Sequence, residues 1–180
     1  MKKLGPKGSR NLKIIHICCI AIWFGGVMSW LPLVWLADLS DFEQTKTTYY
    51  NLRSIAWNVI GWGGISSLAT GLLLGTLTSW QLFKHRWVTV KLFVVICLIL
   101  FGMFFLEARM LTNLDLLIEN RVSAMSDPLF LNNHQLIQVG LVLEAFVFIS
   151  LIAISVLKPR FKKPIHRYKN RTTYDQKIDC

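Results

Sequence analysis

Apolar residues in this chain are gathered into four long runs, with polar segments between them. The runs cover about residues 14–36, 55–78, 88–110 and 135–157. Each holds about 20–25 residues, which at about 1.5 Å per residue is enough to cross a hydrocarbon layer of about 30 Å. Because backbone groups in lipid must be paired within the chain, each run predicts a membrane-spanning helix.

The order of the runs and the connections between them predict the fold class. We expect an all-α integral membrane protein, a four-helix up-down bundle formed by one domain over residues 1–157. A basic tail, residues 158–180, follows it. Residues 37–54 are interpreted as a polar, acidic loop. After the third run, an apolar face recurs at helical spacing, so that helix is expected to continue outside the membrane until Asp127 and Pro128. Its members are Leu111, Leu114, Leu117 and Ile118.

Charge predicts the orientation of the bundle. The formal net charge is +10, and all but four of the 20 Lys and Arg fall in the two tails, the link between the second and third runs, or the residues beside them. The exceptions are Lys46, Arg53, Arg109 and Arg121. The positive-inside rule therefore predicts that both termini are cytoplasmic. The same excess predicts contact with anionic lipids at the cytoplasmic face, and it requires no nucleic acid partner.

His16 and Lys91 are the polar side chains that could carry chemistry near that face. By helical rise they lie about 3 and about 4.5 Å inside its edge, so they are level. A neutral imidazole in an apolar pocket is a typical axial ligand of haem iron, but a histidine at a helix end can also simply be hydrated. Lys91 can reach the headgroups, or it can pair with an anion such as a porphyrin propionate, with Lys84 and Arg86 adding positive charge.

Glu144 lies near the middle of the fourth run with no basic neighbour in sequence. A charge there costs a few kcal/mol, so we expect the carboxyl to be protonated or hydrogen-bonded. A ligand cavity, a proton step, and packing around a carboxyl–hydroxyl bond all remain open for it. Glu144 and Lys91 are the candidate catalytic residues. Depth matching gives Glu144 these neighbours: Gly25 to Val27, Ser66, Ser67, Phe101 and Gly102.

Small and aromatic residues predict how the helices pack. The second run contains several glycines and the GxxxG pair Gly71 and Gly75, which favour close helix contact. Trp23 and Trp62 lie deep in their runs, and we expect both to face inward because a buried indole N–H needs a partner. His134 is interpreted as a water-exposed residue at a helix start.

Two segments resemble a broad group of bacterial membrane proteins, which includes the HemJ-type protoporphyrinogen oxidases and the copper-resistance protein CopD. The segments are HICCIAIWFGG and RWVTVKLFVVICLIL, and the distinctive positions are His16, Trp23, Gly26 and Lys91. The resemblance implies a multi-pass protein of the bacterial cytoplasmic membrane and haem b bound at His16, with Lys91 in the site. Where the oxidases have Leu-Pro-Arg this chain has WLPLVW, so their reaction is not carried across. The resemblance is closest to the uncharacterised branch of the group.

Three functions follow as hypotheses. The first is a haem-b protein with a redox or haem-handling role, in which His16 is the metal ligand, Lys84, Arg86 and Lys91 hold propionates, and Trp23 packs on the macrocycle. A haem-dependent membrane oxidoreductase is one form of it, and the second axial position is left empty or filled by His85. The others are a small-ligand or metal carrier that uses Glu144, and a non-catalytic subunit that pairs with another membrane protein or with a second copy.

Overall fold

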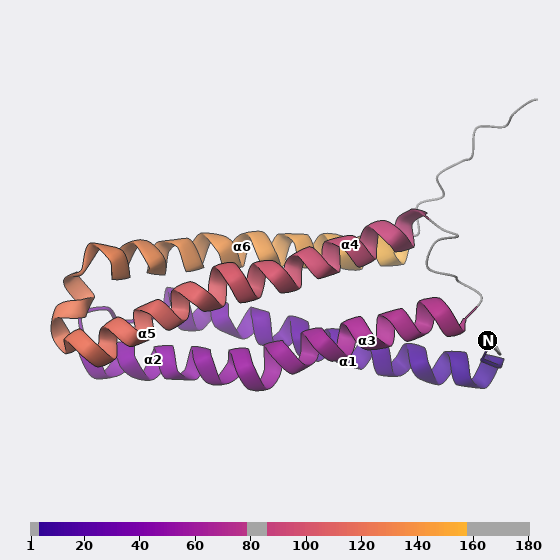
Figure 1. The fold of residues 1–180 in the computed structure, drawn as a ribbon, viewed down its shortest axis with the longest axis horizontal. Helices are drawn as coiled ribbons and strands as arrows, with labels where there is room; N and C mark the ends of the chain where they lie inside the picture. The colour runs from indigo at the N-terminus through magenta and orange to yellow at the C-terminus, as the bar shows by residue number, and fades with distance from the viewer. Residues whose placement is uncertain (1–3, 79–85, 158–180) are drawn as a thin grey trace, which may run out of the picture.

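The computed structural model describes residues 4–78 and 86–157, and within these ranges it contains helices and no strands. Four long helical rods cross the molecule in alternating directions (Figure 1). Their segments are α1 (Pro6–Trp35), α2 (Phe42–Ile55), the π-helical turn η1 (Ala56–Gly61), α3 (Trp62–Leu77), α4 (Arg86–Phe101), the π-helical turn η2 (Gly102–Glu107), α5 (Ala108–Asn120), the 3₁₀ turn η3 (Arg121–Ser126) and α6 (Pro128–Leu157).

The four rods satisfy the length and composition that a membrane span requires. They cover Pro6–Trp35, Phe42–Leu77, Val88–Ser126 and Pro128–Leu157, and each contains a strongly hydrophobic window with few charges. The predicted all-α four-helix architecture is therefore confirmed. The chain is an integral membrane protein by these criteria, and its rods are longer than the runs from which they were predicted.

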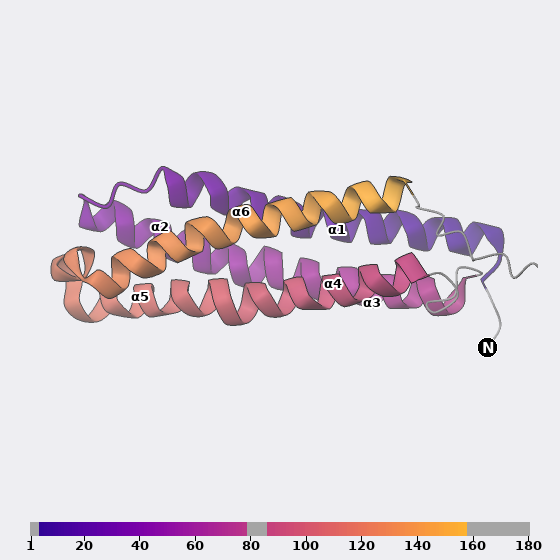
Figure 2. The ribbon, with the colours of Figure 1, turned by 90° about the horizontal axis from the view of Figure 1, so that it is seen from above.

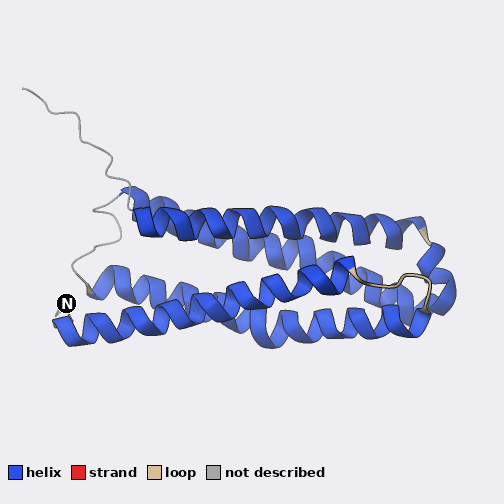
Figure 3. Cartoon of the chain, turned by 180° about the vertical axis from the view of Figure 1, so that it is seen from behind, coloured by secondary structure: helices blue, strands red, loops and turns tan. Residues whose placement is uncertain are grey.

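The bundle has two distinguishable ends. The terminal end holds the start of α1, the end of α3, the start of α4 and the end of α6, and the opposite, closed end holds the α1–α2 loop and η3 (Figures 1 and 3). In the view from above, α6 runs beside α1 (Figure 2). The link 79–85, which includes Lys84 and His85, and the tail from residue 158 onward lie outside the described residues.

The segment interpreted as a loop over residues 37–54 is mostly helix α2, so that prediction was wrong. Asp41 caps the helix, since its carboxylate accepts hydrogen bonds from the backbone N–H groups of Glu43 and Gln44 at 2.9 and 3.2 Å. The low hydropathy of this segment made it resemble a loop. One face of α2 is nevertheless buried at helical spacing, and it carries Thr45, Tyr49 and Leu52.

The remaining loop between α1 and α2 is ordered by a side chain. The hydroxyl and then the backbone N–H of Ser40 donate to Oδ1 of Asp38 at 2.6 and 2.9 Å, and these bonds lower the pKa of that carboxyl. The backbone carbonyl of Asp38 in turn accepts from the Thr45 hydroxyl at 2.8 Å, which ties the loop to α2. A short, bonded turn of this kind brings α2 back along α1.

The extension of the third rod beyond the membrane run is confirmed as α5. Leu114 and Leu117 are fully buried on its inner face, while Ile118 is half exposed and does not belong to that face. Asp127 ends η3, and α6 begins at Pro128, as the Asp–Pro pair predicts.

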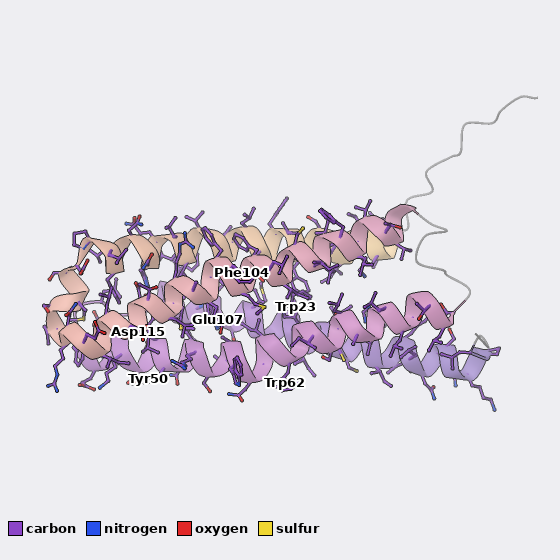
Figure 4. All side chains as sticks on the ribbon, in the orientation of Figure 1. Trp23, Tyr50, Trp62, Phe104, Glu107 and Asp115 are labelled. Carbon is purple, nitrogen blue, oxygen red and sulfur yellow. The ribbon has the colours of Figure 1, made fainter. Side chains whose placement is uncertain are left out.

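Glycines hold α1 and α3 close together, as their number in the second run predicts. A Cβ at Gly63 would lie 2.9 Å from the backbone N and Cα of Trp23, so the two backbones touch there. Trp23 is buried as expected, but Trp62 is 65% exposed and projects outward from its helix (Figure 4). The expectation for Trp62 was wrong, because its side chain lies on the outer face of α3 and not between the helices.

Candidate functional site

His16 makes its hydrogen bond across the α1–α3 interface. Its Nδ1 lies 2.8 Å from the hydroxyl oxygen of Thr70. The Thr70 hydroxyl has one proton, and it lies 2.7 Å from the carbonyl oxygen of Ser66, to which it donates. The oxygen of Thr70 therefore accepts from Nδ1–H, which assigns the proton of the neutral imidazole to Nδ1.

This assignment leaves Nε2 with an unprotonated lone pair. Within residues 4–78 and 86–157, Nε2 of His16 has no side-chain hydrogen-bond partner. A histidine whose Nδ1–H is held by an acceptor is the arrangement that orients an imidazole for metal ligation through Nε2. The side chain is half-buried, so Nε2 is not sealed inside the protein.

Gly71 makes room for the ring. A Cβ at that position would lie 3.1 Å from Cε1 of His16, closer than ordinary van der Waals contact. One glycine of the GxxxG pair thus accommodates an imidazole rather than a facing helix backbone. Gly71 therefore leaves space for the His16 ring, and Thr70, one residue before it, forms the hydrogen bond to that ring.

Lys91, on α4, forms a hydrogen bond to α6. Its Nζ donates to the hydroxyl oxygen of Ser155 at 2.8 Å, and the Ser155 hydroxyl donates to the carbonyl of Leu151 at 2.6 Å. An ammonium has three N–H groups, so this bond uses only one of them. Lys91 is half-buried and forms no ion pair with any carboxylate in the described part of the chain.

The contacts between α1 and α6 place these side chains at one depth. The rings of Trp23 and Phe148 meet with centroids 4.6 Å apart. His16 and Ser155 each lie seven residues from this contact, both toward the terminal end, because α1 and α6 run in opposite directions. Seven residues correspond to about 10 Å in both helices. The prediction that His16 and Lys91 are level is therefore supported through Ser155.

Side chains from all four rods come together at this level of the terminal end. His16 comes from α1, Thr70 and Gly71 from α3, Lys91 from α4 and Ser155 from α6. We call these five residues the terminal-end site, and every rod contributes to it.

The other residues predicted for this site are placed differently. Trp23 lies in the core, with its ring edge against Phe148 and its indole beside Gly64. Figure 4 shows it between the two halves of the bundle. It lies seven residues from His16 along α1, which is about two turns. Lys84 lies outside the described residues, and Arg86 starts α4 with a side chain that the structure does not describe.

Glu144 is buried in the middle of α6, as predicted, but the carboxyl–hydroxyl bond is not formed. The Ser66 hydroxyl donates to Gly63 on its own helix at 3.1 Å, and Ser67 is buried without any hydrogen bond to Glu144. Depth matching was right for Gly102, where a Cβ would lie 3.6 Å from Oε1 of Glu144. On the second rod, the residue that reaches this level is Ile60, which contacts Gly26.

A second polar group, which the sequence analysis missed, fills the closed end. The Tyr49 hydroxyl lies 3.0 Å from Nδ1 of His134, and the Asn113 amide donates to the Tyr49 oxygen at 2.8 Å and to the carbonyl of Phe130 at 3.0 Å. The Asn133 amide donates to Asn113 at 3.0 Å. We call these side chains the closed-end network; its members are Tyr49, Asn113, Asn133 and His134.

The network corrects the interpretation of His134. The residue is only 6% exposed, because α6 begins six residues earlier and α2 covers it. One signal could have revealed the network, since Asn113 lies among Met110, Leu114 and Leu117 on the apolar face of α5. A polar residue on such a face needs buried partners. Asn113 and Tyr49 are fully buried, and their bonds join α2, α5 and α6.

The terminal-end site offers one nitrogen ligand and one ammonium group that uses a single N–H on Ser155. In the described ranges, no group of three or more His, Cys, Asp or Glu side chains could hold a bare metal ion. A metal that brings its own equatorial ligands needs only one or two from the protein. The chemistry of this donor set therefore fits a single axial imidazole beside a positive charge for an anionic group.

A sequence model for the DUF2269 family, described as predicted integral membrane proteins, matches residues 10–159. The chain belongs to this family. The match covers all four rods, and with them His16, Lys91 and Glu144. No curated protein and no solved structure matches the chain. Membership in DUF2269 agrees with the membrane architecture, and the resemblance to the HemJ and CopD group remains an expectation.

Proposed function

We propose that this DUF2269 protein binds haem b at the terminal-end site, with Nε2 of His16 as the axial ligand, and has a redox or haem-handling role in the bacterial cytoplasmic membrane. The observation that supports it is the His16–Thr70 hydrogen bond of 2.8 Å, which holds the imidazole in the Nδ1–H tautomer. That tautomer is the one that ligates iron through Nε2.

Lys91 supplies the second part of the proposal. Its ammonium keeps N–H groups available beyond the bond to Ser155, and a propionate or another carboxylate is the natural partner of a half-buried ammonium. Arg86, which begins α4, and Lys84, two residues before it in the sequence, are proposed to add to this anion-binding role. In this function Glu144 is not a ligand, because it lies about three turns deeper than the His16 level.

The chemistry of the bound group would be one-electron redox change at iron, or storage and transfer of the haem itself. The chain's own contribution is to orient the imidazole through Thr70, to leave room for it at Gly71, and to balance negative charge through Lys91. Trp23 contributes packing beneath the site rather than contact with an anionic group.

The absorption spectrum of the purified protein, oxidised and reduced, with and without added haem, tests the proposal. We expect a Soret band that shifts on reduction and is lost in His16→Ala. Cys18→Ala is the matched control, because Cys18 is exposed on the same helix and its loss should leave the band unchanged. Thr70→Val should retain haem with a weaker, altered band, since Nδ1–H loses its acceptor.

Two results would contradict the proposal. The first is a wild-type protein that stays colourless after haem is added. The second is a folded His16→Ala protein whose Soret band matches that of the wild type. Circular dichroism and a monodisperse elution profile show whether each variant is folded, so loss of the band can be separated from loss of the bundle.

A further inference from the structure

Glu144 is a buried carboxyl for which the fold provides no bond. Its side chain is 3% exposed near the centre of α6. In the described part of the chain it has neither a hydrogen-bond donor nor an ion-pair partner. Buried polar groups in folded proteins are almost always bonded, and an unbonded one costs free energy. A group kept at this cost requires an explanation other than stability.

The neighbours of Glu144 offer its carboxyl no hydrogen bond. Gly102 stands beside the carboxyl and presents no side chain to it. On α1, the register set by the Trp23–Phe148 contact brings Val27 to the same level. Trp30 lies within one turn of it, and its indole Nε1 is also buried without a partner. Two groups with unused hydrogen-bonding capacity thus lie near one depth on adjacent helices.

Both π-helical turns occur at this same depth. The turn η2 begins at Gly102, next to Glu144. The turn η1 contains Ile60, and a Cβ at Gly26 would lie 2.9 Å from that side chain, at the level next to Val27. A π-turn places an extra residue in a helix and costs stability, and such turns are frequent at functional sites. The regular helices are therefore interrupted around the carboxyl on two rods.

No other charge faces Glu144 from the helices packed around it. On α1 there is no charged residue between His16 and Asp38, and α3 carries none. On the third rod the nearest are Glu107 and Arg109, both nearer the closed end, and on α6 the nearest titratable group is His134. The Arg109 guanidinium lies 3.7 Å from the centroid of the Phe105 ring, and its Nη1 donates to the Phe105 carbonyl at 3.0 Å, while its Nε is buried without a partner. No fixed charge beside the carboxyl therefore sets whether Glu144 is protonated.

We propose that Glu144 is a proton-binding site in the membrane interior, which takes up a proton from water and releases it again. A metal ion would need several oxygen ligands, and the residues around Glu144 offer one carboxyl. A proton needs a single oxygen, and the protonated form suits apolar surroundings. This site is separate from the terminal-end site, so the proposal is independent of haem binding.

Infrared spectroscopy of the full-length protein in lipid bilayers tests this proposal. We expect a C=O band of a protonated carboxyl that shifts in D₂O and disappears reversibly as the pH is raised. The band should be absent in Glu144→Gln and retained in Glu107→Gln, which removes the nearest other carboxyl along the bundle. A band that neither shifts in D₂O nor responds to pH would overturn the proposal, since it would belong to a permanently closed group.

Thermal stability gives a second, independent readout. Because the carboxyl has no partner, Glu144→Leu should raise the midpoint of thermal unfolding while abolishing the exchangeable band. A residue retained for packing would behave in the opposite way. A lowered midpoint in both Glu144→Leu and Glu144→Gln would show that the carboxyl is part of the structure and would contradict the proposal.

Discussion

At the closed end of the bundle, Tyr49, Asn113 and His134 bond to one another and are buried. At the terminal end, His16 and Lys91 each bond one hydroxyl, remain half-buried and keep further bonding capacity. Both ends contain a histidine in a helix, yet only one of the two has a ring nitrogen without a side-chain partner. His134 has Tyr49 on Nδ1 and Gln138 at 3.4 Å from Nε2.

The difference teaches how polar groups are used along one bundle. Bonds that are complete in a buried network hold helices in one arrangement and leave nothing for a ligand. A side chain that uses only some of its hydrogen-bonding atoms is oriented by those bonds, and its other atoms can still bond to a ligand. On this basis the closed end is structural, and the terminal end is where a bound group is expected.

The closed-end network should be most sensitive to the loss of Asn113. Asn113→Ala removes the bonds to Tyr49, Phe130 and Asn133 at once and leaves their polar atoms buried. We expect a loss of about 3 kcal/mol in the free energy of unfolding, measured by denaturant titration in detergent. Unchanged stability would show that the network does not hold the closed end together. Asp115→Ala, on the same helix but outside the network, is the control.

The α1–α3 contact that supports His16 can be tested with a pair of glycines. Gly63→Ala places a methyl group 2.9 Å from the backbone of Trp23, and we expect it to destabilise the bundle by about 1–3 kcal/mol. Nothing lies within 4 Å of a Cβ at Gly25, so Gly25→Ala should be neutral or slightly stabilising. Equal unfolding midpoints for the two variants would contradict the close backbone approach.

Much of this arrangement could be predicted from the sequence, because its signal is local. Hydropathy gives the spans, and counting helical rise puts His16 and Lys91 at one depth. The glycine content of the second run predicts close helix contact, and the structure identifies α1 as the partner. In the same way, the helical spacing of apolar positions from Leu111 to Ile118 predicts α5.

The closed-end network could not be predicted in this way, because its bonds are not local. Tyr49, Asn113 and His134 come from three rods, and their pairing depends on how those rods are aligned. The low hydropathy of α2 also concealed a buried face. Depth matching found Gly102 but missed Ile60, which lies six residues before Ser66 in the sequence. A π-turn adds a single residue, so it explains little of that offset. The larger cause is that the second rod begins at Phe42, well before the run from which depth was counted.

Lys91 should have a smaller effect than His16 on the terminal-end site. Lys91→Gln removes the positive charge but keeps a donor for Ser155, and we expect about tenfold weaker haem binding, or ~1.4 kcal/mol, in a spectroscopic titration. Lys46→Gln, on α2 near the closed end, should bind as tightly as the wild type. Equal haem affinity in Lys91→Gln and Lys46→Gln would show that Lys91 does not contribute to haem binding. The site would then rest on His16 alone.

Rescue by imidazole tests the central claim, that the terminal end presents a histidine nitrogen to iron, most directly. His16→Gly removes the ring but keeps its space beside Gly71, so the variant should lack the wild-type Soret band and regain it when free imidazole is added with haem. Recovery of the band at millimolar imidazole is the result that the account predicts. Wild-type haem binding by His16→Gly in the absence of imidazole would contradict it.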